Sequence, residues 1–319
     1  MSDYSVSARN LSKKFGHGHH AVQAVDGVSF DVKKGELFGL IGPDGAGKTT
    51  LFRLLTSLMV PDSGTAVVEG FDTVKDYRQI RRIIGYMPGR FSLYQDLSVE
   101  ENLKFFATLF GSTVAKSYDA IKPIYRYLEP FKKRMAGRLS GGMKQKLALC
   151  CALVHAPKVL FLDEPTTGVD PVSRKEFWEM LGTLQDQGIS IVASTPYMNE
   201  AVRCHRIAFV QDGKISECDT PENIRRKFPH AILAVRSRDA FSLLQDLRKF
   251  PEAHSCYSFG NYQHLYLHSE GGADGSAARL QEYLEGKGHQ DIRIEPIEAS
   301  IEDCFMLRMN KEGGDYGDV

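Results

Sequence analysis

The chain has 319 residues, which is enough for one large domain or for a large domain with a smaller one. Forty basic residues balance forty acidic ones, so no net charge attracts nucleic acid or an anionic membrane surface. No apolar run approaches the roughly 20 residues that span a bilayer, and the N-terminus lacks the apolar region of a secretory signal. The six cysteines include no C-x-x-C pair, so we expect a reduced cytoplasmic protein without a cysteine-bound metal.

The first predicted elements are edge strands and a buried strand that leads into a helix. Residues 6–32 alternate between apolar and polar side chains, as edge strands do, and residues 36–41 form an apolar strand. A helical pattern follows through Leu51, Leu54, Leu55 and Leu58, and residues 65–69 predict another strand. The beginning of the chain therefore predicts antiparallel strands beside a strand–loop–helix unit.

The middle of the chain predicts an inserted helical region followed by further strands. Residues 98–155 are mostly helical in pattern, and we expect the apolar stripe of Leu103, Phe106, Ala107 and Phe110 to be ordinary core packing. Short apolar runs at 159–162, 189–193 and 207–210 are typical of buried parallel strands, and Asp212–Gly213 is a hairpin turn. Strands that alternate with helices indicate an α/β fold with a mixed sheet core.

A second, smaller unit is predicted from residue 231 onwards. Its segments follow the order strand, helix, strand, strand, helix, strand, at residues 231–235, 240–247, 255–257, 264–268, 277–284 and 292–296. This β-α-β-β-α-β order predicts a ferredoxin-like α+β domain over residues 231–308. The polar, glycine-rich residues 309–319 predict a disordered tail.

Residues 42–49 read GPDGAGKT and match the phosphate-loop pattern G-x-x-x-x-G-K-[ST]. The loop lies between a predicted strand and a predicted helix, which is the context that gives the pattern its meaning. Its glycines let backbone N–H groups curl around an anion, and the helix N-terminus adds its positive end. Lys48 is then placed to reach the β- and γ-phosphates, and the Thr49 hydroxyl to bind Mg²⁺.

Asp163 and Glu164 follow directly on the apolar strand at 159–162. A carboxylate at the end of such a strand can hold Mg²⁺ through its water shell, and its neighbour can orient or deprotonate the attacking water. Two adjacent acids at a strand end can also cap a helix or face solvent, which is the weaker alternative in this context. Residues 139–145, LSGGMKQ, place a serine and two glycines before a helix and predict a second anion site.

The phosphate loop, the LSGGMKQ segment and the Asp163–Glu164 pair, which follow one another in this order along the chain, resemble the motifs of the ATP-binding cassette ATPases. The resemblance extends over residues 5–225. The resemblance implies a P-loop NTPase cassette over residues 1–230, with its helical subdomain at about 87–157. It implies ATP and Mg²⁺ as cofactors, Glu164 and Lys48 as catalytic residues, and Thr49 and Asp163 as metal ligands. The residues that it implies for nucleotide binding are Phe15, Gly42, Pro43, Asp44, Gly45, Ala46, Gly47, Lys48, Thr49, Thr50, Asp163, Ser140, Gly141, Gly142, Gln145 and Asp170.

Some of these roles depend on the family arrangement of two cassettes. Phe15 corresponds to the aromatic ring that stacks on adenine, although an ordinary strand aromatic is the alternative. Ser140, Gly141 and Gly142 correspond to the signature that contacts the γ-phosphate bound by the opposite subunit, and Asp170 to a polar contact across that interface. Asp44 stands where the family more often has asparagine.

Two departures from the family pattern affect the predicted site. Gly89 stands where the family has a glutamine that binds Mg²⁺ and relays contact with the membrane partner, and Gln95 offers no evident substitute. Pro196 stands where the family has a histidine that contacts the γ-phosphate, and proline has neither a side-chain donor nor an N–H. Preorganised donors of this kind contribute about 3–4 kcal/mol each, so the resemblance implies a weakened site.

The resemblance implies the ATPase subunit of a membrane exporter. Residues 295–305 resemble the C-terminal ending of cassettes from the drug- and antibiotic-exporter branch. The implied partners are membrane permease subunits and a second cassette, with a heterodimer favoured over a homodimer, and no nucleic acid. The implied location is cytoplasmic, on the inner face of the membrane. A regulatory subunit that binds nucleotide with little turnover, and a soluble cassette ATPase that acts outside transport, are the alternatives.

Overall fold

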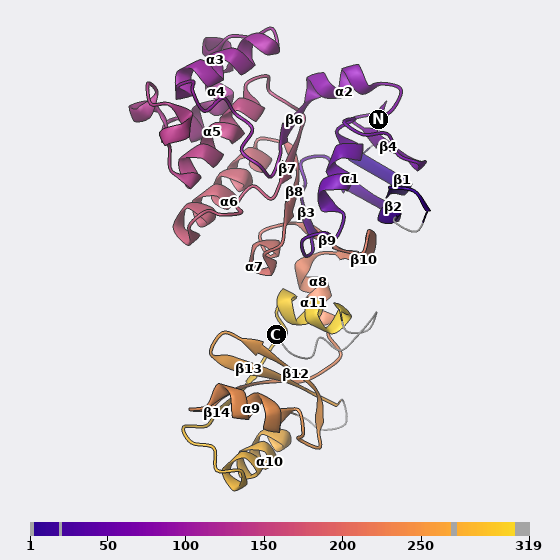
Figure 1. The fold of residues 1–319 in the computed structure, drawn as a ribbon, viewed down its shortest axis with the longest axis vertical. Helices are drawn as coiled ribbons and strands as arrows, with labels where there is room; N and C mark the ends of the chain where they lie inside the picture. Colours follow the sequence, from indigo (N-terminus) through magenta and orange to yellow (C-terminus); the bar gives the residue numbers. More distant parts are fainter. Residues whose placement is uncertain (1–2, 19–20, 269–272, 310–319) are drawn as a thin grey trace. The chain divides into compact units, whose positions relative to one another are not determined.

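The computed structural model describes residues 3–18, 21–268 and 273–309, in two compact units, Met1–Pro221 and Glu222–Val319 (Figure 1). Among these described residues, none of the helices has the length and apolar character that crossing a bilayer requires. The predicted tail lies outside the described residues except for Met309, which is the last residue of a helix and not part of a tail.

The first unit contains an antiparallel sheet and a mixed sheet. The antiparallel sheet has the order β2-β1-β4-β5 and consists of β1 (Tyr4–Phe15), β2 (Val22–Lys33), β4 (Ser63–Val68) and β5 (Phe71–Asp72). The mixed sheet has the order β10-β9-β3-β8-β7-β6. Its strands are β3 (Leu37–Ile41), β6 (Ile84–Met87), β7 (Val159–Asp163), β8 (Ser190–Thr195), β9 (Arg206–Gln211) and β10 (Lys214–Asp219).

Parallel pairing in the mixed sheet explains why its strands β3 and β7 are buried along their whole length. Strands β9, β3, β8, β7 and β6 pair in parallel, and every residue of β3 and β7 is buried. A strand that is covered on both faces has no solvent side for polar residues. Strand β10 pairs antiparallel with β9 through the predicted Asp212–Gly213 turn, which confirms the hairpin.

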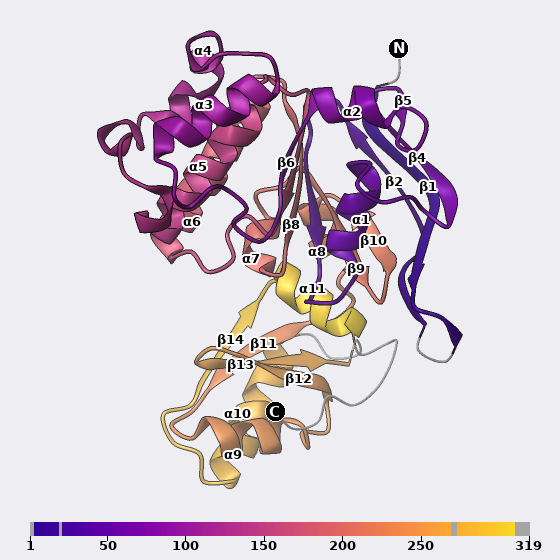
Figure 2. The same ribbon diagram turned by 45° about the horizontal axis from the view of Figure 1, so that its top comes forward.

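Helices cover both faces of the mixed sheet (Figures 1 and 2). Helix α1 (Lys48–Leu55) packs Leu51, Phe52, Leu54 and Leu55 into the core that it shares with both sheets. Helix α6 (Pro171–Asp186) buries Phe177, Trp178 and Leu181 on the other side. The shorter helix α2 (Tyr77–Ile83) contacts β5 and β6, and the short helix α7 (Met198–Ala201) contacts β3 and β8.

The inserted helical subdomain lies between β6 and β7 in the sequence. It consists of α3 (Val99–Leu109), α4 (Val114–Tyr125) and α5 (Gly141–Leu153), with short 3₁₀ turns at Glu129–Phe131 and Ala136–Arg138. The core-packing prediction for its apolar stripe is right for Leu103 and Ala107, which are buried. It is wrong for Phe110, which is 37% exposed because it lies beyond the end of α3 and faces a cavity.

The second unit has the predicted ferredoxin-like topology. Its antiparallel sheet has the order β12-β13-β11-β14, which is the arrangement that a β-α-β-β-α-β chain produces. The elements are α8 (Pro221–Arg226), β11 (Ile232–Arg236), α9 (Ala240–Leu247), β12 (Ala253–Phe259), β13 (Tyr262–Leu267), α10 (Ala273–Gly286), β14 (Arg293–Ile297) and α11 (Ile301–Met309).

The division between the units falls after Pro221 and not at residues 230–231 as predicted. Apart from its first residue, Pro221, helix α8 lies in the second unit, because its residues contact the segment that leads into α11. Ile224 is buried and its carbonyl accepts from the Cys304 thiol at 3.6 Å, while the Arg225 Nε donates to the Ala299 carbonyl at 2.9 Å. The sequence pattern alone did not reveal these contacts, because they join residues far apart in the chain.

Candidate active site

The predicted phosphate loop connects β3 to α1, and two of its glycines are required by the space around them. A Cβ on Gly42 would lie 2.1 Å from the Val210 carbonyl oxygen, and one on Gly47 would lie 2.1 Å from that of Ala24. Gly47 also has φ +101, is the N-cap of α1 and provides no side-chain cap. The first N–H groups of α1 are therefore left for an anion at the loop.

The other loop residues take positions that suit a backbone cradle. Asp44 and Gly45 are exposed, whereas Ala46 is buried and its N–H donates to the Pro43 carbonyl at 3.3 Å. Thr50 is partly buried on the first turn of α1.

Lys48 is buried to 3% exposure and already binds several oxygens. Its Nζ donates to the carbonyl oxygens of Gly42 and Pro43, both at 2.8 Å, and lies 3.1 Å from a carboxylate oxygen of Glu164. Glu164 has φ +49, which turns the chain at the end of β7 and brings its side chain towards the loop. The structure thus brings together the two residues that were predicted to be catalytic.

Asp163, at the end of β7, accepts from hydroxyls on two neighbouring elements. Its Oδ2 accepts from Thr49 Oγ1 and its Oδ1 accepts from Ser194 Oγ, both at 2.8 Å. The Thr49 proton is used in this bond, so the hydroxyl's lone pairs are left for a cation, and both residues supply the oxygens that Mg²⁺ prefers. The donor set therefore fits the implied magnesium ion.

Ser194 is a site residue that the sequence did not reveal. Besides donating to Asp163, its Oγ accepts from the Glu164 backbone N–H at 3.0 Å. The only signal in the sequence is a hydroxyl at the end of a buried strand. Its role depends on β8 lying beside β7, which the order of the sheet decides.

The two departures from the family pattern lie at the edges of this site. A Cβ on Gly89 would lie 3.1 Å from the Asp163 carbonyl oxygen and 3.9 Å from the Glu164 Cβ. Pro196 directly follows Thr195, the last residue of β8. Gln95 lies elsewhere, in the helical subdomain, where its carbonyl accepts from the Gly137 N–H at 2.9 Å. Neither edge position supplies a polar side chain.

The signature segment begins α5, on the opposite side of strands β6 to β8 from α1 (Figures 1 and 2). Ser140 is the N-cap of this helix, and a Cβ on Gly142 would lie 2.7 Å from Ser173 Oγ. Gly141 is exposed. Within one chain, the structure does not bring Ser140, Gly141 and Gly142 together with the phosphate loop.

Three further predicted residues lie away from the loop. Gln145, one turn inside α5, lines a cavity beside β6, and within this chain it lies apart from the phosphate loop. Asp170 is the exposed N-cap of α6, and a hydrogen bond from the Ser173 N–H at 2.9 Å lowers the pKa of its carboxyl. Phe15 ends β1 and is 40% exposed, so it is not part of the core.

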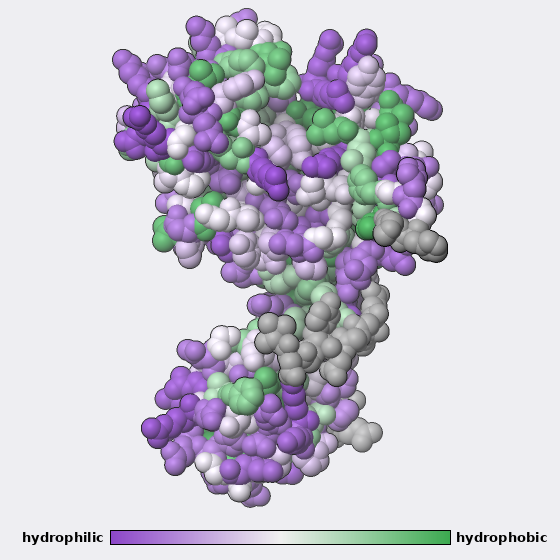
Figure 3. Space-filling view, viewed as in Figure 1, coloured by the Kyte–Doolittle hydropathy of each residue, from purple (hydrophilic) through white to green (hydrophobic). Residues whose placement is uncertain are grey.

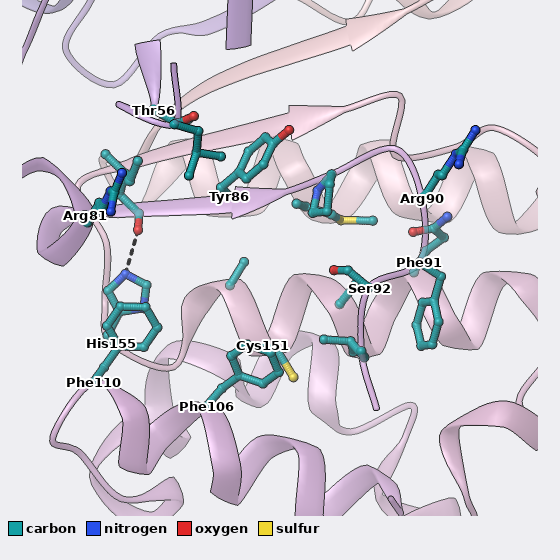
Figure 4. A pocket seen from close by; sticks show the side chains of 18 residues that line it. Thr56, Arg81, Tyr86, Arg90, Phe91, Ser92, Phe106, Phe110, Cys151 and His155 are labelled. Atoms are coloured by element: carbon teal, nitrogen blue, oxygen red, sulfur yellow. Dashed lines mark hydrogen bonds between the residues drawn. The ribbon is translucent and has the colours of Figure 1, made fainter. Parts of the chain in front are cut away.

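The cavity beside β6 has a volume of about 240 Å³ and is mostly apolar (Figure 4). Phe106 and Phe110 line it from the helical subdomain, and the Phe110 ring stacks on His155 at 3.8 Å. His155 Nε2 is bonded to the Ile84 carbonyl at 2.8 Å, and burial lowers the pKa of this imidazole. Tyr86 lines the same cavity, and burial, followed by the nearby Asp163 charge, raises its pKa to about 12.

Comparison with known proteins finds one family model, described as ABC transporter, which matches residues 25–167. The chain is 37% identical over 311 residues to the "Probable multidrug ABC transporter ATP-binding protein YbhF" of Escherichia coli (strain K12), covering 96% of this chain and 52% of that protein. It is 35% identical over 311 residues to the "Nod factor export ATP-binding protein I" of Burkholderia lata, covering 96% and 97%. The chain thus spans about half the length of YbhF and nearly all of the second relative.

Solved structures of ATP-binding cassettes resemble this chain over about two thirds of its length. The dimeric, post-hydrolysis state of the cassette MJ0796 bound to ADP and Pi is 25% identical with a TM-score of 0.61, covering 67% of this chain and 98% of that one. A structure described as the ATP binding subunit of an ABC transporter is 30% identical with a TM-score of 0.62, covering 70% and 92%.

Proposed function

The chain belongs to the ABC transporter family as an ATP-binding subunit, and from this premise we propose that it hydrolyses ATP for a membrane exporter of drugs or other small molecules. One observation carries the proposal: Thr49 is bonded to Asp163 beside the Lys48–Glu164 pair. A glycine cradle, a lysine, a hydroxyl and two acids are the parts that magnesium-dependent hydrolysis of a nucleoside triphosphate requires.

Each of these groups has a defined task in the proposed reaction. The N–H groups of the loop and the Lys48 ammonium bind the β- and γ-phosphates. Thr49 and Asp163 hold Mg²⁺, which would neutralise charge on the phosphates when bound. Glu164 accepts the proton of the attacking water, and Ser194 keeps Asp163 in place through its hydrogen bond.

The proposed site is weakened relative to the family pattern. Position 89 is close enough to Asp163 for a side chain there to reach the metal region, but glycine offers none. Position 196 begins the segment after β8, but proline offers no donor. Because each missing donor is worth about 3–4 kcal/mol, we expect turnover at this site to be lower by a hundredfold or more.

The signature supports pairing with a second cassette. Ser140 and the glycines begin a helix on the far side of β6 to β8 from the chain's own loop, so any phosphate that they contact must be held by another molecule. We propose a heterodimer, in which this signature completes a fully equipped site on the partner cassette. Asp170 would then lie at the interface in addition to capping α6.

The apolar cavity supports the other proposed partner, a membrane permease. Aromatic residues line the cavity, and more hydrophobic side chains are exposed nearby on α3, including Phe105 at 40% and Leu109 at 64%. Figure 3 shows hydrophobic residues exposed at the top of the helical subdomain. We therefore place the chain on the inner face of the membrane, bound to permease subunits through this surface.

A regulatory subunit that binds nucleotide with little turnover is the second candidate, because Gly89 and Pro196 leave the binding groups intact. Measuring ATP hydrolysis by the purified chain, alone and in complex with its proposed cassette and permease partners, distinguishes the two candidates. We expect slow hydrolysis alone and faster hydrolysis in the complex. Both candidates are contradicted if calorimetry detects no affinity of the chain for Mg-ATP, or if Lys48→Ala leaves nucleotide binding unchanged.

A further inference from the structure

Glu200, on the short helix α7, is a buried acid that the proposed mechanism does not use. Its side chain is 3% exposed, yet both carboxylate oxygens have partners. Oε2 accepts from Thr195 Oγ1 at 2.5 Å, and Oε1 accepts from Thr166 Oγ1 at 2.8 Å. The Arg174 Nε lies 3.6 Å from Oε1 and supplies the opposite charge.

The two threonines belong to the segments that carry the candidate active site. Thr166 lies in the turn directly after Glu164 and is 1% exposed. Thr195 is fully buried beside Ser194, and its carbonyl accepts from the Gly42 N–H of the phosphate loop at 3.4 Å. The Glu200 carboxylate therefore joins the turn after β7 to the end of β8. The end of β8 is in turn bonded to Gly42, the first residue of the phosphate loop.

Arg174 extends this cluster towards the segment that includes Asp170. Its guanidinium lies 4.0 Å from the centre of the Tyr197 ring, and its Nη2 donates to the Val169 carbonyl at 3.4 Å. The side chains on either side of Pro196 are therefore both fixed, Thr195 by Glu200 and Tyr197 by Arg174. The segment after β8 is held in place without a polar side chain at position 196.

A buried carboxylate contributes little net free energy to a fold, because the cost of removing its charge from water offsets most of the stabilisation from its hydrogen bonds and ion pair. A fully bonded carboxylate does fix the positions of the groups that it joins. We propose that Glu200 is a positioning residue for ATP hydrolysis, which holds the Glu164 turn against the end of β8 and the phosphate loop. This role rests on the proposed function of the site.

The test compares Glu200→Gln with Glu36→Gln in the full chain, assayed in its complex. Glutamine keeps the shape of Glu200, but it replaces one carboxylate oxygen with an NH₂ group, which cannot accept from a threonine hydroxyl, and it does not neutralise Arg174. Glu36 is a matched control: it is 6% exposed and lies 3.4 Å from Arg206, at the end of β3 opposite the phosphate loop. Thr166→Val, which removes one donor at nearly constant shape, is the milder second variant.

We expect kcat to fall about 10- to 100-fold in Glu200→Gln and less in Thr166→Val, since misplacement by about 1 Å costs this much. The Kd for Mg-ATP should stay within about twofold, because the phosphate-binding groups are unchanged. Hydrogen exchange of residues 164–170 should quicken in Glu200→Gln and not in Glu36→Gln.

The outcomes separate the two proposals. If the wild-type complex hydrolyses ATP and Glu200→Gln has the same kcat, only the role of Glu200 is overturned. The Tm of each variant is measured beside its kcat. If Glu36→Gln loses as much kcat as Glu200→Gln, in proportion to its own fall in Tm, the effect is merely structural and the role of Glu200 is also overturned. A wild-type complex that binds Mg-ATP without turnover overturns the proposed hydrolysis, and with it any positioning role in that reaction.

Discussion

The Lys48 ammonium lies 3.1 Å from a carboxylate oxygen of Glu164. The proposed phosphate ligand and the proposed base therefore neutralise each other in this conformation. A triphosphate competes with Glu164 for the same cation, so we expect ligand binding to release the carboxylate from the lysine. The ion pair thus connects occupation of the loop with the availability of the base.

Glu164→Gln should lower turnover by about 100-fold or more, because a neutral amide cannot accept the proton of water. Its affinity for Mg-ATP should be equal to or higher than that of the wild type, because Lys48 loses its anionic competitor. Calorimetry and a phosphate-release assay measure the two effects. Glu176→Gln, which removes the ion pair between a half-exposed glutamate and the buried Lys146, is the control. Brisk hydrolysis in Glu164→Gln contradicts the assignment of the base.

The double variant Gly89→Gln, Pro196→His should hydrolyse ATP faster than the wild-type chain, by about 100-fold if both side chains reach the phosphates. The gain follows from restoring a metal-region amide and a γ-phosphate donor. Gly182→Gln on α6 is a matched control, because open space surrounds that glycine. Equal turnover in the double variant and the wild type would show that these positions do not limit the site.

Ser194→Ala should raise the Mg²⁺ concentration needed for half-maximal activity by about tenfold, which is the usual effect of losing a hydrogen bond that orients a metal ligand. The alanine leaves Asp163 Oδ1 without the donor that it has at 2.8 Å. A magnesium titration of ATP hydrolysis gives the measurement. Thr183→Ala, whose hydroxyl donates only within its own helix, should not change the requirement.

Tyr266→Phe should destabilise α11 by about 1.5–3 kcal/mol, the range for a hydrogen bond to a charged group. The Tyr266 hydroxyl donates to the buried Asp303 carboxylate at 2.8 Å, as do His264 Nδ1 at the same distance and the Ser300 N–H. Hydrogen exchange of the α11 amides measures the change. Tyr262→Phe is the control, because this ring is partly exposed on the same strand.

Asp303 also predicts a pH dependence for the second unit. Burial raises the pKa of this carboxyl, but the bonds from His264, Ser300 and Tyr266 outweigh burial and lower it overall. Its stabilising contribution is therefore complete above the ordinary carboxyl value of about 4 and is lost as pH falls through the lower folded value. The free energy of unfolding of the second unit, measured by denaturation of the full chain, should be lower at pH 3 than at pH 5. This difference between the two pH values should be smaller in Asp303→Asn.

Phe110→Asp should prevent co-purification with the proposed permease partner and leave hydrolysis by the isolated chain unchanged. A carboxylate in the apolar cavity opposes burial by a partner. Phe241→Asp, at an exposed phenylalanine of the second unit, is the control. Retention of the permease by Phe110→Asp contradicts the placement of this contact.

The sequence by itself determined the features that arise from neighbouring residues. The phosphate loop, the apolar strands β3 and β7, and the acids that end β7 are local patterns, since glycine conformation and strand burial depend on residues close together in the chain. The β-α-β-β-α-β order of the second unit also follows from periodicity, which restricts a short chain to few topologies.

Only the tertiary structure decided which side chains meet across elements. Ser194 reaches Asp163 because β8 lies beside β7, and Glu200 reaches Thr166 because α7 turns back over the strand ends. Phe110 and Gln145 face a cavity and not the core or the nucleotide loop, because packing of α3 and α5 sets which helix face is covered. Periodicity identifies an apolar residue, but its partner depends on contacts between distant segments, which no local pattern contains.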